Sequence, residues 1–158
     1  MIVHPIPPVF DEKSEILILG SFPSVKSRET EFFYGHSQNR FWRVLTAICG
    51  GELPTTNEEK TEFLLKNRIA LWDVIASCEI SGSADSTIKN VIPNDLSTIL
   101  DTANIRRIFV NGKTAEKYYK KYSEKKTGMT ATCLPSTSPA NAAYSLEKLI
   151  HNWREIQL

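Results

Sequence analysis

The sequence predicts an α/β fold, a three-layer α/β/α sandwich around a central four-stranded parallel sheet. Four short apolar runs without polar alternation are typical of strands that are covered on both faces. Segments with helical periodicity separate these runs, as in parallel α/β folds. The chain has 158 residues, of which 41% are hydrophobic and 23% are charged, an ordinary composition for a globular protein. We therefore expect residues 1–158 to form a single domain.

The four apolar runs are the expected strands, and each ends in small or polar residues. They occupy residues 15–20, 69–74, 107–111 and 130–135. The longest stretch without a clear pattern is residues 78–93, which contain Ser81-Gly82-Ser83. Long irregular loops in small domains often carry function, so we expect a functional loop here.

Helices are expected between and after the strands. Their predicted ranges are residues 39–49, 56–66, 93–100, 114–122 and 139–156. Thr56, with Glu59 three residues later, forms a capping box at the start of the second helix. Ser138 and Pro139 suit the N-cap and first position of the last helix.

Charge and cysteine content restrict the classes of protein. The net charge is +1, without the strong basic excess of many nucleic-acid binders. The lysine-rich residues 113–126 have helical spacing and indicate a solvated helix face. Cys49, Cys78 and Cys133 form no CxxC pair, so we expect buried free thiols in a reducing compartment. No apolar run reaches membrane-spanning length and no export signal is evident, which favours a cytoplasmic protein.

Functional residues are expected where the carboxyl ends of the parallel strands meet. Four clusters follow the predicted strands: residues 20–24, Asp73, residues 111–112 and residues 136–141. The sequence holds no GxxxxGK[ST] loop, no GxGxxG fingerprint and no GxSxG elbow. Its histidines lack metal-ligand spacing. The sequence therefore predicts a site without metal or cofactor, built from amide, carboxylate, hydroxyl and aromatic groups.

Each candidate also has a structural interpretation. Asn39 precedes an apolar-periodic helix and is a suitable N-cap, but its amide can also position a water or bind a base edge. Tyr34, near Phe32 and Phe33, is either a stacking surface for a base or part of a hydrophobic staple. Asp73 is either a cap at the strand exit or a site carboxylate. The STSPAN turn is either an ordinary helix start or an anion site.

Three stretches together resemble a known family: GSFPS, FYGHSQNRFWRVL and LPSTSPAN. They are similar to motifs of the uracil-DNA glycosylase superfamily, and most of all to its hypoxanthine-DNA glycosylase branch, family 6. The resemblance extends over residues 16–153. It implies an enzyme that flips a deaminated base out of DNA, most readily hypoxanthine, and hydrolyses its N-glycosidic bond. A monofunctional enzyme is expected, since no isolated lysine lies in the site clusters.

The resemblance also assigns residues. Phe22 occupies the position where most of the superfamily has a catalytic Asp or Asn, so the catalytic role passes to Asn39. Tyr34 lies where relatives stack an aromatic ring on the base, and Leu134 replaces a histidine of the uracil-specific branch. Ser37 departs from the proline of many relatives, and no bulky wedge residue is evident. The implied base-binding residues are Gly20, Ser21, Phe22, Pro23, Tyr34, His36, Asp73 and Asn111. The implied DNA-binding residues are Ser136, Thr137, Ser138, Pro139, Ala140 and Asn141.

The partner is then DNA that carries a deaminated base, and the expected protein is a monomer without membrane contact. DNA binding should depend on a local patch that includes Lys26, Arg28 and Arg40. Two alternatives stay open. The chain is a uracil- or xanthine-directed glycosylase, or it is a non-catalytic DNA- or nucleotide-binding domain of the same fold, a possibility raised by Phe22.

Overall fold

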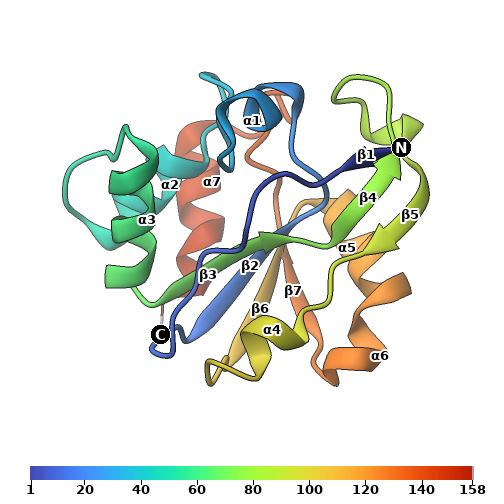
Figure 1. The fold of residues 1–158 in the computed structure, drawn as a ribbon. Helices are drawn as coiled ribbons and strands as arrows, with labels where there is room; N and C mark the ends of the chain where they lie inside the picture. The colour runs from blue at the N-terminus through green and yellow to red at the C-terminus, as the bar shows by residue number, and fades with distance from the viewer. Residues whose placement is uncertain (158) are drawn as a thin grey trace.

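A computed structural model describes residues 1–157 and confirms the predicted fold class. Its centre is a parallel sheet with the strand order β3-β2-β6-β7 (Figure 1). The strands are β2 (Ile16–Gly20), β3 (Ile69–Asp73), β6 (Arg107–Asn111) and β7 (Ala131–Leu134). All four agree with the predicted runs to within one residue at each end. The chain runs from β2 to β3 at one edge of the sheet and then returns to the other side of β2 to form β6 and β7.

Strand residues alternate between two apolar clusters, one on each face of the sheet. Ile16 and Ile18 of β2 pack into one cluster, whereas Leu17 and Leu19 pack into the other. All four side chains are at most 2% exposed. This burial on both faces explains why the sequences of these strands are continuous apolar runs.

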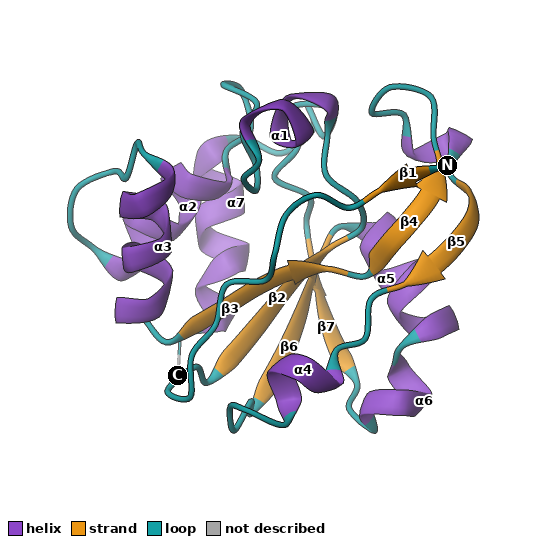
Figure 2. Cartoon of the chain, viewed as in Figure 1, coloured by secondary structure: helices purple, strands orange, loops and turns teal. Residues whose placement is uncertain are grey.

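Helices cover both faces of the sheet (Figure 2). One face carries α2 (Phe41–Cys49), α3 (Asn57–Lys66) and α7 (Leu146–Trp153). The other carries α4 (Ser97–Leu100), α5 (Lys113–Tyr122) and α6 (Glu124–Thr127). The capping box of Thr56 and Glu59 is present at the start of α3. None of the helices among the described residues is long and apolar enough to cross a membrane.

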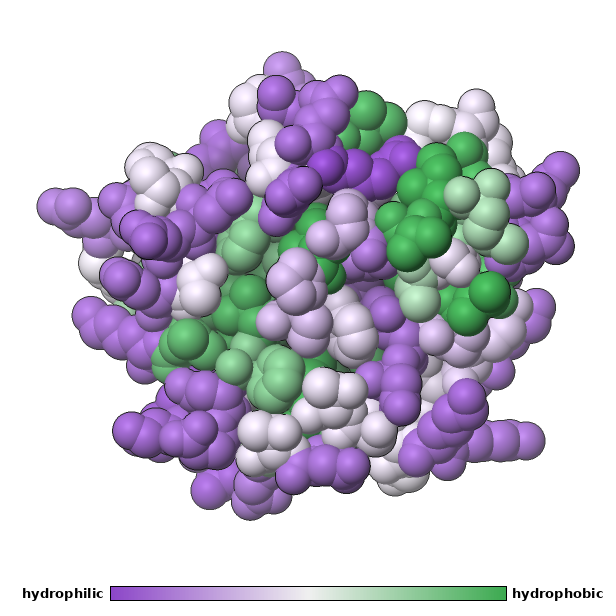
Figure 3. Space-filling view, viewed as in Figure 1, coloured by the Kyte–Doolittle hydropathy of each residue, from purple (hydrophilic) through white to green (hydrophobic). Residues whose placement is uncertain are grey.

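A second, antiparallel sheet was not predicted. It has the order β1-β4-β5 and consists of β1 (Ile2–Val3), β4 (Ile75–Glu79) and β5 (Lys89–Pro93). The expectation that residues 78–93 are irregular was therefore wrong at both ends, because these residues pair with each other across a hairpin. Only the middle of this stretch is a loop, with the short 3-10 helix η1 (Asp85–Thr87). Figure 3 shows apolar side chains near this sheet, where Val3 is 70% and Ile92 54% exposed.

Three helix starts also differ from the predictions. The helix predicted from residue 93 is α4, which begins only at Ser97 because Pro93 is the last residue of β5. The last helix, α7, begins at Leu146 instead of residue 139, because Ser145 supplies its cap by accepting a hydrogen bond from the Lys148 N–H. Residues 139–145 form turns. A further helix, α1 (Val25–Thr30), was not predicted, although the Ser24 side chain caps it in the usual way by accepting from the Ser27 N–H.

Candidate active site

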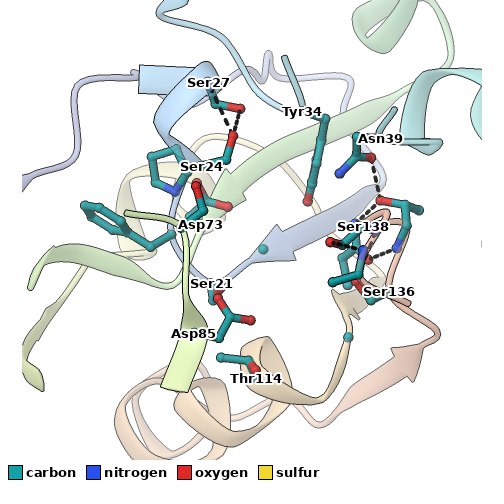
Figure 4. A pocket seen from close by; sticks show the side chains of 18 of the residues that line it. Ser21, Ser24, Ser27, Tyr34, Asn39, Asp73, Asp85, Thr114, Ser136 and Ser138 are labelled. Carbon is teal, nitrogen blue, oxygen red and sulfur yellow. Dashed lines mark hydrogen bonds between the residues drawn. The ribbon is translucent and has the colours of Figure 1, made fainter. Parts of the chain in front are cut away.

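A cavity of about 340 Å³ lies at the carboxyl ends of β2, β3 and β6 (Figure 4). Its volume is at the lower end of the range of small-molecule pockets, about 300–1,000 Å³. This position is the switch point of the parallel sheet, where such folds bind ligands. Most predicted site residues line it: Gly20, Ser21, Phe22, Pro23, Tyr34, Asn39, Asp73, Asn111, Ser136, Thr137, Ser138 and Ala140.

Three predicted residues do not line the cavity. His36 is exposed, and its Nδ1 accepts a hydrogen bond from the Gln38 N–H, which ties the ring to its own turn. The prediction that His36 binds the base is therefore not supported. Pro139 is exposed at the tip of the loop of residues 136–141, and the Asn141 amide donates to the Ser136 carbonyl within that loop.

Asn39 is held by two hydrogen bonds to one atom. Its Oδ1 accepts from the backbone N–H of Phe41 at 2.9 Å and from the hydroxyl of Thr137 at 2.9 Å. The first bond satisfies the first N–H of α2, but the N-cap itself is Arg40, so the N-cap prediction for Asn39 is one residue too early. An amide oxygen has two lone pairs, and both are used. The side chain therefore offers the cavity a donor, its Nδ2 amide group, and not an acceptor.

Thr137 links Asn39 to Asn111. The Asn111 amide donates to the Thr137 hydroxyl at 3.0 Å, and Asn111 Oδ1 accepts from the Thr137 N–H at 3.1 Å. Thr137 is 0% exposed. It was predicted to contact DNA, which its complete burial prevents. Its hydroxyl instead fixes the orientation of the Asn39 amide.

Arg40 and Arg28 were predicted to contact DNA, but both guanidinium groups serve the protein itself. Arg40 donates to the carbonyls of Ser138, Asn141 and Tyr144, and so fixes residues 138–144 against the start of α2. Arg28 donates to the Gly82 carbonyl at 2.6 Å. Its guanidinium carbon also lies 5.7 Å from the centre of the Phe22 ring. Of the predicted basic patch, Lys26 is left for contact with DNA.

Tyr34 stands in the cavity wall with a strained backbone, at a φ of 53°. Its ring stacks on Phe41 with 4.1 Å between the centroids. The hydroxyl is buried and makes no well-formed hydrogen bond among the described residues, although the Asn111 side chain lies near enough to interact with it. Burial, and then the nearby Asp73 carboxylate, raise the pKa of this hydroxyl well above its usual value, so it stays protonated and able to donate. Phe32 and Phe33, by contrast, are core residues.

Gly20 gives Tyr34 and Asp73 the space that they occupy. A Cβ atom at position 20 would lie 2.4 Å from Asp73 Oδ1 and 2.9 Å from the Tyr34 hydroxyl oxygen. Both polar groups therefore border the same small space in the cavity, above Gly20 at the end of β2. Asp73 is only 3% exposed, and its other oxygen, Oδ2, lies 2.7 Å from Nε2 of His4.

Several residues at the site were not predicted from the sequence. His4 is 69 positions from Asp73 and only the pairing of β1 with β4 brings it there. The side of the cavity across from Asn39 is lined by Ile80, Ser83, Ala84, Asp85, Lys113 and Thr114. The middle of residues 78–93 thus reaches the site, as the loop prediction required.

Among residues 1–157 no group of three or more His, Cys, Asp or Glu side chains is arranged to hold a metal ion.

The fold and the cavity together define a class: an α/β/α sandwich whose strand ends enclose a small pocket of amide, carboxylate and aromatic groups. The family model of the uracil DNA glycosylase superfamily matches residues 7–157. The chain belongs to this superfamily, which confirms the resemblance found in its motifs.

Two relatives and one solved structure agree with this assignment. A Methanosarcina barkeri protein named hypoxanthine DNA glycosylase is 38% identical over 151 residues, covering 94% of each chain. A Methanosarcina acetivorans protein of the same name is 38% identical over 147 residues, covering 92% of each chain. The solution NMR structure of a candidate uracil DNA glycosylase from Methanosarcina acetivorans has a TM-score of 0.81 and 35% identity, with 98% of each chain covered.

Proposed function

We propose that this protein is a monofunctional DNA glycosylase that removes hypoxanthine from DNA by hydrolysing its N-glycosidic bond. The observation that carries the proposal is the fixed amide of Asn39, which presents a donor to a cavity of base-compatible size. Membership of the superfamily and the names of the two Methanosarcina relatives support it. Phe22 is at the cavity and supplies no polar group, so the chemistry falls to Asn39.

In the proposed reaction, the C1′–N9 bond of the flipped nucleotide breaks, and the bonding electrons leave with the base. The sugar becomes oxocarbenium-like and a water adds its hydroxyl to C1′, while the water proton ends on the released base. Such an electrophilic sugar needs a well-placed water more than a strong base. Asn39 Nδ2 donates to the water oxygen and fixes its position, which leaves a lone pair of the water free for attack.

Base and DNA contacts follow from the same geometry. Asp73, Tyr34 and the backbone at Gly20 bind the base at the floor of the cavity. The exposed tip of the 136–141 loop, at Pro139 and Ala140, faces the DNA backbone together with Lys26.

The proposal takes residues 1–158 as one domain acting as a monomer, and the match of the family model over residues 7–157 supports the single domain. It also places the protein in the cytoplasm, with its three cysteines as free thiols.

The test is cleavage of duplex oligonucleotides that carry hypoxanthine, uracil or xanthine, scored as alkali-labile abasic sites. We expect the fastest release from the hypoxanthine duplex. Faster release of uracil or xanthine would reassign the substrate, and no release from any duplex would leave only a binding function.

Two variants at position 39 test the donor role. Asn39→Ala removes the amide, and Asn39→Asp keeps its shape and the acceptor for the Phe41 N–H at the start of α2 but has no donor. We expect both to lower the single-turnover rate by about 10²–10³-fold, the usual cost of losing one transition-state donor. Cleavage by Asn39→Asp at the wild-type rate would show that position 39 acts as an acceptor or base instead.

A further inference from the structure

The segment before β2 places a histidine directly behind Asp73, one of the residues that line the cavity. β1 pairs with β4, and the His4 N–H donates to the Ala76 carbonyl at 2.7 Å. The His4 side chain is 3% exposed. Its ring contacts three aromatic rings, with centroid distances of 5.8 Å to Phe22, 6.1 Å to Phe33 and 6.5 Å to Trp72. This degree of enclosure fixes the ring in one orientation.

The hydrogen bonds of His4 determine its tautomer. Nδ1 accepts from the backbone N–H of Ile6 at 3.2 Å, so this nitrogen carries a lone pair. In a neutral imidazole the proton is then on Nε2, which lies 2.7 Å from Asp73 Oδ2. His4 is therefore the donor and Asp73 the acceptor.

The same bond orients Asp73. With Oδ2 held by His4, Oδ1 faces the point above Gly20 where the Tyr34 hydroxyl also lies. Tyr34 is protonated, and its hydroxyl proton has no acceptor among the described residues. The cavity thus presents one acceptor and one donor side by side, and the donor is free to bind a ligand.

We propose that His4 is a positioning residue that locks Asp73 as an acceptor, so that Asp73 and Tyr34 read the N–H and C=O edge of a deaminated base. In hypoxanthine, N1–H donates to Asp73 Oδ1 and O6 accepts from the Tyr34 hydroxyl. Adenine has the opposite pattern, an acceptor at N1 and a donor at N6, and is rejected. This inference rests on the proposed function, and it adds how the protein distinguishes the damaged base from its parent.

The Asp73→Asn variant distinguishes a positioning role of His4 from a purely structural one. With His4 present, Nε2–H holds the amide oxygen and turns the new NH₂ group toward the base, where it opposes N1–H. If His4 is also replaced by leucine, the amide is free to rotate and can present its oxygen. The Asp73→Asn, His4→Leu double variant should therefore cleave the hypoxanthine duplex faster than Asp73→Asn alone, by about tenfold for one recovered hydrogen bond. A purely structural role for His4 predicts the opposite sign, because two buried sites are then damaged.

The experiment measures single-turnover rates per competent site. Competent sites are counted by titration with a duplex that carries a tetrahydrofuran abasic analogue, which contains no base to be read. His4→Gln, whose amide can donate from the position of Nε2, should keep most of the wild-type rate, and His4→Leu should lose about tenfold. A double variant no faster than Asp73→Asn, or His4→Leu as fast as wild type, would overturn the inference. Absence of hypoxanthine release by the wild type would instead refute the proposed function.

Discussion

Replacing Thr137 by valine removes one hydroxyl and keeps the shape of a completely buried side chain. Two hydrogen bonds disappear, the one donated to Asn39 Oδ1 and the one accepted from the Asn111 amide. Asn39 Oδ1 still accepts from the Phe41 N–H, so it is not left unpaired. The Asn111 Nδ2 group loses the Thr137 hydroxyl as its acceptor, which costs about 1–3 kcal/mol of stability, whereas Asn111 Oδ1 still accepts from the backbone N–H of residue 137.

The effect on the reaction is separate from the effect on stability. One of the two bonds that orient the Asn39 amide is lost, and such a bond contributes about 1 kcal/mol. Since 1.4 kcal/mol corresponds to a tenfold change, we expect a five- to tenfold lower single-turnover rate on the hypoxanthine duplex. Thr137→Ser keeps the hydroxyl and should restore the rate, although it leaves a small cavity.

Thermal denaturation gives the stability change, and rapid-quench cleavage with enzyme in excess gives the rate. Rates are compared well below the melting temperature of the weakest variant, so that all samples are folded. If Thr137→Val is folded and cleaves as fast as the wild type, the orientation of Asn39 does not depend on Thr137, and our account of the site is wrong.

Four further results are expected. Gly20→Ala forces Asp73 and Tyr34 apart and should weaken cleavage more than stability, as rate and melting measurements will show. Arg40→Gln loosens the 138–144 segment, and limited proteolysis should cut there. The pKa of Glu59 is lowered by hydrogen bonds from Thr55 and Thr56, so its stabilisation exists above the usual carboxyl pKa and is lost as the pH falls; Glu59→Gln should flatten acid unfolding. With a net charge of +1, DNA affinity should fall only modestly with salt in titrations.

The parallel sheet was predictable because its strands are covered on both faces. A strand such as β2 must then be apolar at every position, and that pattern stands out in the sequence. The strands β4 and β5 belong to a small sheet with one side near the surface. Their sequences, IASCE and KNVIP, mix polar and apolar residues and carry no strong period. Only their pairing with each other and with β1 makes them strands.

The site was predictable where its residues follow strands directly, as at Gly20, Asp73 and Asn111. The start of α7 was misplaced because both Ser138 and Ser145 are suitable caps, and the sequence alone does not show that Arg40 holds the intervening residues in turns. His4 was missed for a different reason. Its partner is 69 positions away, and no local pattern distinguishes it from any other histidine near a chain end.

The N-terminal strand β1 and the last helix, α7, lie on different sides of the molecule (Figure 1). The N-terminal strand packs beside the cavity, and His4 is three peptide bonds from Met1. A purification tag or fluorophore attached there would crowd the residues that shape the base pocket. After α7 the chain reaches Ile156 and Gln157, which lie near Ile16 and Ile69 at the amino ends of β2 and β3, on the edge of the sheet opposite the cavity. Fusions and surface tethers intended to report native activity should therefore be joined at the C-terminal side.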